Sequence, residues 1–267
     1  MPDNADATAK DEIELAGVDK VFGTFDGDVA ALDRTDLRVA RGEFLVLLGP
    51  SGCGKTTILR IIAGLLEPSH GNVKIGGRDL WVGGRRDDKA VQELGVVFQD
   101  ASLFPWFSIE QNIALPLRLR GASRQAQRDK ARELCELVGI AGFEKRWPRE
   151  LSGGMRQRAA IARALSYDPE ILLMDEPFGA LDAMTRDQMN LELQRIWLDR
   201  GCTIVFVTHS IPEAVFLGDR IVLLSPRPGR IDSITEVPFD RSRQMAVQAD
   251  PAFQTIVKDL RDRLEAM

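Results

Sequence analysis

Short apolar runs, separated by longer polar stretches, dominate the pattern along the chain. Five of them have the length of a strand, at 44–48, 95–98, 171–174, 203–207 and 220–224. Strands of a parallel sheet are buried on both faces and therefore show continuous apolar runs rather than strict alternation. The pattern predicts a largely parallel sheet at the core of an α/β fold.

Helical periodicity appears between these runs. One apolar stripe recurs at i, i+3, i+4 and i+7, formed by Ala131, Leu134, Cys135 and Val138, and positions 189, 193, 196 and 197 repeat it. The first stripe predicts a helical insert between the second and third strands. A short strand and turn pattern occurs around 71–77, and a last helix is expected over 250–265.

The first apolar run leads into a complete phosphate-loop pattern, G-x-x-x-x-G-K-[ST]. Its residues are Gly49, Pro50, Ser51, Gly52, Cys53, Gly54, Lys55, Thr56 and Thr57. The glycines allow backbone N–H groups to surround phosphate oxygens, and a helix expected over 56–66 adds its positive end. We expect Lys55 to reach the β- and γ-phosphates and Thr56 to bind Mg²⁺. Because Cys53 lies beside Lys55 and this helix end, a lowered thiol pKa is also expected.

Two acidic residues that suit phosphate chemistry follow the strand predicted at 171–174. Asp175 and Glu176 come directly after it, at the carboxyl edge of the sheet where ligands of such folds bind. Asp175 is placed to hold Mg²⁺, and Glu176 to polarise an attacking water. Two acids at a strand end could equally form a solvated turn, and the phosphate loop decides against that alternative.

A second glycine-bearing loop occurs at 151–155, Leu-Ser-Gly-Gly-Met, before a basic stretch. In this order, the motifs resemble the ATP-binding cassette (ABC) ATPases over residues 12–230. The resemblance implies a P-loop NTPase fold with a RecA-like parallel sheet, an antiparallel β-subdomain and an inserted α-helical subdomain at about 100–163. It places the ATPase domain at 12–240, after a disordered tip at 1–11 and before a helical tail at 241–267.

The resemblance also implies roles for residues that are weak signals alone. Gln99 would contact Mg²⁺ and the attacking water, and His209 the γ-phosphate, while 180–182 (Ala-Leu-Asp) would form the D-loop, with Asp182 at the nucleotide. Ser152, Gly153 and Gly154 would bind the ATP held by a second subunit, so that the working unit is a dimer. Met155 departs from the usual Gln, which puts side-chain contacts at the end of the loop in question.

An aromatic ring that stacks on adenine is expected upstream of the phosphate loop. Phe22 stands where the family pattern has one, and Phe25 is the competitor. A phenylalanine face is adequate for stacking. Packing of either ring in the core is the alternative.

Composition narrows the class of protein. The 267 residues carry a formal net charge of −5, which disfavours a nucleic-acid partner. The basic runs at 124–132 and 241–243 are interpreted as solvated helix faces. No apolar run has the roughly 18 residues of a membrane span, and the polar first residues lack the pattern of a signal peptide. Three scattered cysteines favour free thiols in a reducing cytoplasm.

Softer features indicate a transport role. Residues 103–107 (Leu-Phe-Pro-Trp-Phe) form an apolar cluster. In transport members of the family, this region receives a short helix of the membrane subunit. The alternative is that these side chains pack over the chain's own helical insert. Residues 178–186 and 224–230 resemble nitrate, sulfonate and taurine importers. We therefore expect a peripheral subunit on the cytoplasmic face of the membrane, with permease subunits and an external solute-binding protein as partners.

Other members of the family remain alternatives. An export or lipid-trafficking cassette shares all the catalytic motifs. A soluble cassette ATPase of DNA repair or translation usually has a coiled-coil insertion or two cassettes in one chain, and neither is found here.

Overall fold

The computed structural model describes residues 11–25, 27–179 and 181–267. Its main sheet has the strand order β12-β11-β3-β10-β9-β8. The five parallel strands are β3 (Phe44–Leu48), β8 (Leu94–Val97), β9 (Ile171–Asp175), β10 (Thr203–Thr208) and β11 (Arg220–Leu224). Antiparallel β12 (Ile231–Glu236) forms one edge. The predicted parallel sheet and α/β fold class are confirmed.

A second, antiparallel sheet has the order β2-β1-β4-β5. It contains β1 (Asp11–Thr24), β2 (Gly27–Ala40), β4 (His70–Ile75) and β5 (Arg78–Asp79), and a small hairpin follows, β6 (Trp81–Val82) with β7 (Arg85–Arg86). Asp11 already pairs with Ala40, so assigning it to a disordered tip was wrong. The rest of that predicted tip, 1–10, lies outside the described residues.

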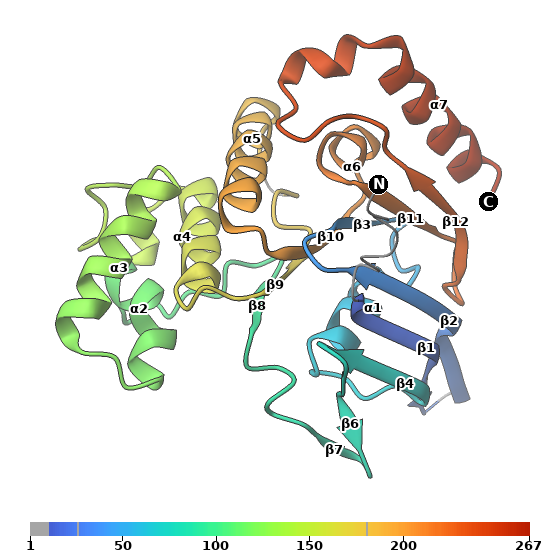
Figure 1. Ribbon diagram of the computed structural model, residues 1–267, viewed down its shortest axis with the longest axis horizontal. Coiled ribbons are helices and arrows are strands. Elements are labelled where there is room, and N and C mark those ends of the chain that lie inside the picture. The colour runs from blue at the N-terminus through green and yellow to red at the C-terminus, as the bar shows by residue number, and fades with distance from the viewer. Residues whose placement is uncertain (1–10, 26, 180) are drawn as a thin grey trace, which may run out of the picture.

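Helices cover the main sheet and form a separate group beside it. They are α1 (Lys55–Ile62), α2 (Ile109–Leu119), α3 (Arg124–Leu137), α4 (Gly153–Leu165), α5 (Ala183–Arg200), α6 (Ile211–Leu217) and α7 (Pro251–Glu265), with 3-10 turns η1 (Pro148–Glu150) and η2 (Met245–Ala249). Figure 1 shows α2, α3 and α4 gathered on one side, away from the antiparallel sheet. This group stands where the helical insert was expected.

Helix α1 is shorter than the predicted 56–66. Gly64 has φ 65°, and the N–H groups of Gly64 and Leu65 donate to the carbonyls of Ile61 and Arg60. This is the hydrogen-bond pattern of a Schellman motif, in which a left-handed glycine ends a helix. The apolar residues after Gly64 therefore belong to the following turn.

The main sheet buries both of its faces, as the continuous apolar runs predicted. Alternate residues of β3 enter two different cores: Leu45 and Leu47 pack with α1 and the antiparallel sheet, whereas Phe44 and Val46 pack with α4 to α7. All of these β3 side chains are fully buried. The sheet therefore fixes the position of the loops at its carboxyl edge.

The C-terminal segment is attached to this core through arginines. Arg243 is only 5% exposed, and its guanidinium donates to the carbonyls of Val215, Phe216 and Gly218 at the end of α6, and to that of Phe239. Its main chain exchanges two hydrogen bonds of 2.7 Å with the side chain of Gln194 in α5.

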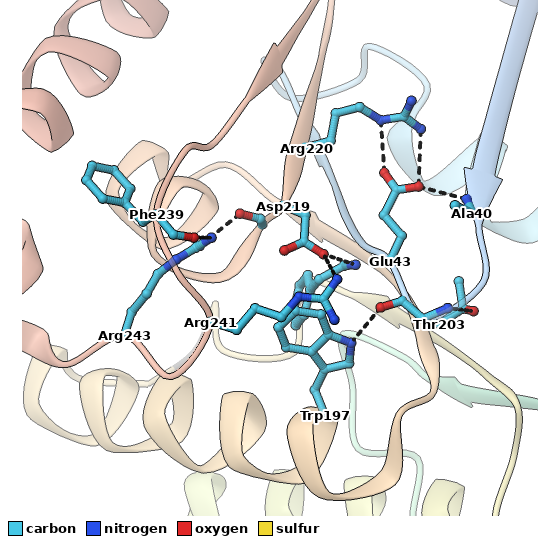
Figure 2. Close-up of polar contacts among 12 residues, drawn as sticks. Ala40, Glu43, Trp197, Thr203, Asp219, Arg220, Phe239, Arg241 and Arg243 are labelled. Carbon is cyan, nitrogen blue, oxygen red and sulfur yellow. Dashed lines mark hydrogen bonds and ion pairs between the residues drawn. The ribbon is translucent and has the colours of Figure 1, made fainter. Parts of the chain in front are cut away.

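Arg241 adds a second attachment. Its guanidinium lies 4.4 Å from the centre of the Trp197 ring and 3.0 Å from the carboxylate of Asp219 (Figure 2). The interpretation of 241–243 as a solvated helix face was wrong, because this stretch is not helical and its arginines satisfy main-chain and side-chain acceptors of the core.

Candidate functional site

The phosphate loop joins β3 to α1 and holds its lysine inward. Lys55 is 5% exposed, and its Nζ donates to the carbonyls of Gly49 at 2.7 Å and Pro50 at 2.9 Å. Gly54 has φ 95°, and a Cβ there would lie 3.0 Å from the carbonyl oxygen of Ala31. Glycine is therefore needed at this position both for its backbone conformation and for its close neighbour.

Thr56 and Asp175, 119 positions apart, meet at the mouth of this loop. The Thr56 hydroxyl donates to Asp175 Oδ1 over 2.9 Å. Burial raises the pKa of Asp175, and the hydrogen bond from Thr56 opposes that effect. A hydroxyl and a carboxylate are hard oxygen donors, so this pair fits Mg²⁺, which takes one or two carboxylates together with water and phosphate oxygens. Two of the three residues predicted to bind the metal, Thr56 and Asp175, are therefore brought together.

Glu176 and His209 form the second pair of the site. Glu176 Oε2 lies 3.0 Å from His209 Nδ1, and the Glu176 N–H donates to the Val207 carbonyl over 3.0 Å. Glu176 has φ 44°, a left-handed conformation that costs a non-glycine residue about 1–2 kcal/mol. Such strain in a residue directly after a buried strand is typical of active sites, because it aims a side chain out of the regular sheet.

Gln99 lies just beyond β8, next to β9 in the sheet. Its side chain is exposed and makes no hydrogen bond within the described chain. The carbonyl of the preceding residue, Phe98, accepts a hydrogen bond from Gln157 Nε2 in α4 over 3.2 Å. The position of Gln99 is thereby connected to the helix that follows the second anion loop.

That second loop forms the start of α4. Ser152 is the N-cap, and its hydroxyl accepts from the N–H of Met155 at 3.3 Å. A Cβ on Gly154 would lie 3.3 Å from Leu181 and 3.4 Å from Thr185, so the loop touches the D-loop region. Ser152 and Gly153 are exposed, and the resolved parts of this chain give the loop no hydrogen bond to its own phosphate loop.

Asp182 has a local role that the sequence did not reveal. It is the N-cap of α5, and its carboxylate accepts from the Thr185 N–H at 3.0 Å and the Thr185 hydroxyl at 2.7 Å. These two hydrogen bonds lower the pKa of Asp182. Ala180, the first residue of the predicted D-loop, lies outside the described residues.

Phe22 and Phe25 are both on the surface. Phe22 is 38% exposed in β1 with Lys20 Nζ 5.4 Å from its ring centre, and Phe25 is fully exposed beyond the strand end. Neither ring packs in the core, so the alternative of core packing is excluded for both.

Cys53 does not have the lowered pKa expected from its neighbours. Its side chain is 1% exposed, and burial raises the pKa of the thiol more than Lys55, 3.9 Å away, lowers it. The Sγ atom points into the core beneath the loop, where a Cβ on Gly49 would lie 2.8 Å from it. The three cysteines are free and buried.

Gly229, in the turn between β11 and β12, supports the phosphate loop and was missed. A Cβ on Gly229 would lie 1.9 Å from the Cys53 carbonyl oxygen, and the Gly229 N–H donates to Ala31 over 3.1 Å. Its place in the sequence Pro-Arg-Pro-Gly marked a turn. The contact with a loop far away in the chain left no signal in the sequence.

Comparison with known proteins agrees with this geometry. The ABC transporter family matches residues 32–179. An uncharacterised ABC transporter ATP-binding protein of Methanocaldococcus jannaschii is 46% identical over 88% of this chain and 85% of its own. The aliphatic sulfonates import ATP-binding protein SsuB of Bacillus licheniformis is 47% identical over 89% of this chain and 88% of its own.

A solved structure shares the fold. It is a dimeric ATP-binding cassette in a post-hydrolysis state bound to ADP and Pi, with a TM-score of 0.76 and 34% identity over 85% of this chain and 100% of its own. A phosphate loop, a threonine–aspartate pair and a glutamate–histidine pair lie together at one edge of the sheet, an arrangement that suits phosphoryl transfer to water. The chain belongs to the ABC transporter family and is one of its ATP-hydrolysing, ATP-binding subunits.

Proposed function

We propose that this subunit drives the import of small anionic solutes of the nitrate, sulfonate or taurine type. The observation that carries the proposal is the similarity to SsuB along nearly the whole chain. Residues 178–186 and 224–230, which resemble the same importer group, support it. The chain is a peripheral component, on the cytoplasmic face of the membrane, of a complex with permease subunits and an external solute-binding protein. In the described portion, no helix combines the length and apolar character of a membrane span.

The geometry of the site supports a role in hydrolysis for each of its residues. Lys55 and the loop N–H groups bind the β- and γ-phosphates of ATP, with Phe22 against the adenine. Thr56, Asp175 and Gln99 would hold Mg²⁺, which would neutralise charge on the phosphates. Glu176 orients the attacking water, and its hydrogen-bonded neighbour His209 donates to the γ-phosphate.

The site is completed by a second copy of the chain. Ser152, Gly153 and Gly154 present a hydroxyl and a helix N-terminus, which suit phosphate. Ser152 and Gly153 are exposed, and within the described residues none of the three makes a hydrogen bond with its own phosphate loop. We assign them, with the D-loop residue Asp182, to the ATP of the opposite subunit.

A mixed dimer tests this assignment. Ser152→Arg in one subunit should abolish hydrolysis of the ATP held by the other subunit and leave its own site active. Loss of the mutant's own nucleotide site instead would show that the loop acts within one chain.

The permease is assigned to an apolar groove beside Gln99. The groove has a volume of about 550 Å³ and is lined by Leu94, Phe98, Phe104, Leu115, Leu119 and Tyr167, among others. Leu103 packs against the core, but Trp106 is 63% exposed with its ring 5.5 Å from that of Phe104. A groove of this kind suits a short amphipathic helix of the membrane subunit.

Import is tested by deleting the gene and measuring uptake of radiolabelled taurine, an alkanesulfonate and nitrate. Uptake of one of these solutes should be lost, and should be restored by the wild-type chain but not by Glu176→Gln. Unchanged uptake of all three, or loss of an export activity instead, would contradict the proposal.

A further inference from the structure

A buried carboxyl group lies directly behind the catalytic pair. Glu213, in the first turn of α6, is 6% exposed. Its Oε2 accepts a hydrogen bond from the hydroxyl of Thr208, and that hydroxyl accepts from the N–H of Ser210 at 3.0 Å. Its Oε1 has no hydrogen-bond partner in the described chain. Thr208 and Ser210 are the two neighbours of His209.

This arrangement is a capping box with a hydroxyl inserted into it. In the usual capping box, a glutamate three residues into the helix accepts directly from the N–H of the N-cap residue. Here Ser210 is the N-cap and Glu213 the third helical residue, but the Thr208 hydroxyl stands between them. One carboxyl group therefore fixes the backbone on both sides of His209, whereas an ordinary cap would fix only the helix end.

The same carboxyl faces the D-loop side of the site. Arg186 of α5 attracts Glu213 electrostatically, and its guanidinium donates to the carbonyl of Leu181 over 2.9 Å. Glu213, Arg186, Glu176 and His209 all line one cavity of about 10 Å³. A cavity of that size has room for about one water molecule, so little empty space separates these side chains.

The hydrogen bond that Glu213 accepts does not require a charged group. Burial raises its pKa, and the hydrogen bond from Thr208 and the charge of Arg186 oppose that effect. The carboxyl accepts from Thr208 through one oxygen, and the amide oxygen of a glutamine can do the same.

We propose that Glu213 is a positioning residue, which acts through Thr208 and Ser210 to hold His209 against Glu176. The proposal rests on the role assigned above to His209 in hydrolysis. It does not depend on whether the complex imports or exports.

Steady-state ATPase assays of the full-length chain test the effect on rate. Glu213→Ala and Thr208→Val, which remove the link, should lower kcat on the order of 10-fold with little change in KM, because displacing a catalytic group by even 1 Å can cost more than this. Glu213→Gln and Thr208→Ser, which keep a hydrogen-bonding group, should stay within about twofold. All rates are measured below the Tm of the least stable variant.

A double-mutant cycle separates positioning from general support of the fold. In the His209→Ala background, Glu213→Ala should lower the residual single-turnover rate by less than twofold, since the group that it positions is gone. An equal loss in both backgrounds would overturn the proposal.

The imidazole signals provide a readout without nucleotide. The chain has two histidines, so its NMR spectrum contains imidazole signals of His70 and His209 only. The variant His70→Gln shows which signal belongs to which histidine. Glu213→Ala should shift or split the His209 signal and leave that of His70, which pairs with Asp19, in place. An unmoved His209 signal overturns the proposal. If instead His209→Ala keeps full kcat, the role of His209 in the proposed function fails.

Discussion

Gly229→Ala is the most direct test of how the phosphate loop is supported. The added Cβ would lie 1.9 Å from the carbonyl oxygen and 2.9 Å from the carbonyl carbon of Cys53. Ordinary contact begins near 3.4 Å, so the two backbones must separate by about 1.5 Å. Neither segment can move as easily as a flexible side chain. Cys53 belongs to the backbone of the phosphate loop, and the turn that carries Gly229 is held by hydrogen bonds from the Gly229 N–H to the Ala31 carbonyl and from the Asp33 N–H to the Gly229 carbonyl.

The expected loss follows from that displacement. Misplacing reacting groups by about 1 Å costs on the order of 100-fold in rate, or about 2.7 kcal/mol. We therefore expect kcat/KM for ATP to fall on the order of 100-fold and the Kd of a fluorescent ATP analogue to rise on the order of 10-fold. The assays are phosphate release and fluorescence titration.

Gly218→Ala is the matched control. Its Cβ would also be crowded, 2.9 Å from Val46 and 3.0 Å from the Ala214 carbonyl, but these neighbours are outside the phosphate loop. It should lower the Tm without changing the Kd for the analogue. Gly229→Ala with a Kd and a kcat/KM within twofold of wild type would refute the reasoning.

Three further predictions concern single side chains. Glu176→Gln should bind ATP normally, stop turnover and accumulate an ATP-bound dimer in size-exclusion chromatography; normal hydrolysis would exclude Glu176 as the group that orients water. Cys53, whose thiol pKa is raised by burial, should react with iodoacetamide at pH 8 far more slowly in the folded than in the urea-unfolded chain, and equal rates would contradict its burial. Arg243→Met removes the guanidinium that donates to four carbonyls and should lower the free energy of unfolding by about 3 kcal/mol in urea titrations. Arg241→Ala, at a more exposed residue, should lower it by less than about 1 kcal/mol. Equal losses would show that the buried hydrogen bonds of Arg243 do not add to stability.

The features that the sequence predicted well are those that depend on residue type. Burial on both faces requires the apolar runs, and phosphate binding requires Lys55 and Thr56 in register, so the main sheet and the phosphate loop were visible in the chain. Thr56 and Asp175 were each assigned to Mg²⁺ from the sequence, and they lie together because parallel strands deliver their loops to one edge.

The features that were missed depend on the main chain of distant segments. Arg243 resembled a solvated base because its acceptors are carbonyl groups, which every residue has. Gly229 is required by the backbone of Cys53, and Glu213 by the hydroxyl of Thr208 and the N–H of Ser210. The lengthened prediction for α1 arose because Leu65 and Leu66 continue an apolar pattern after Gly64 has ended the helix.

The attachment of the C-terminal segment also has a consequence for sequence drift in this protein. The acceptors that Arg243 uses on α6 are main-chain carbonyls, and no substitution at Val215 or Phe216 can remove them. The donor is one particular side chain, and no other residue type offers a planar fork of five N–H groups. Tolerance of substitution should therefore differ between the two sides of the contact. Side chains of α6 can be replaced without losing these hydrogen bonds, whereas the C-terminal segment must keep arginine at position 243.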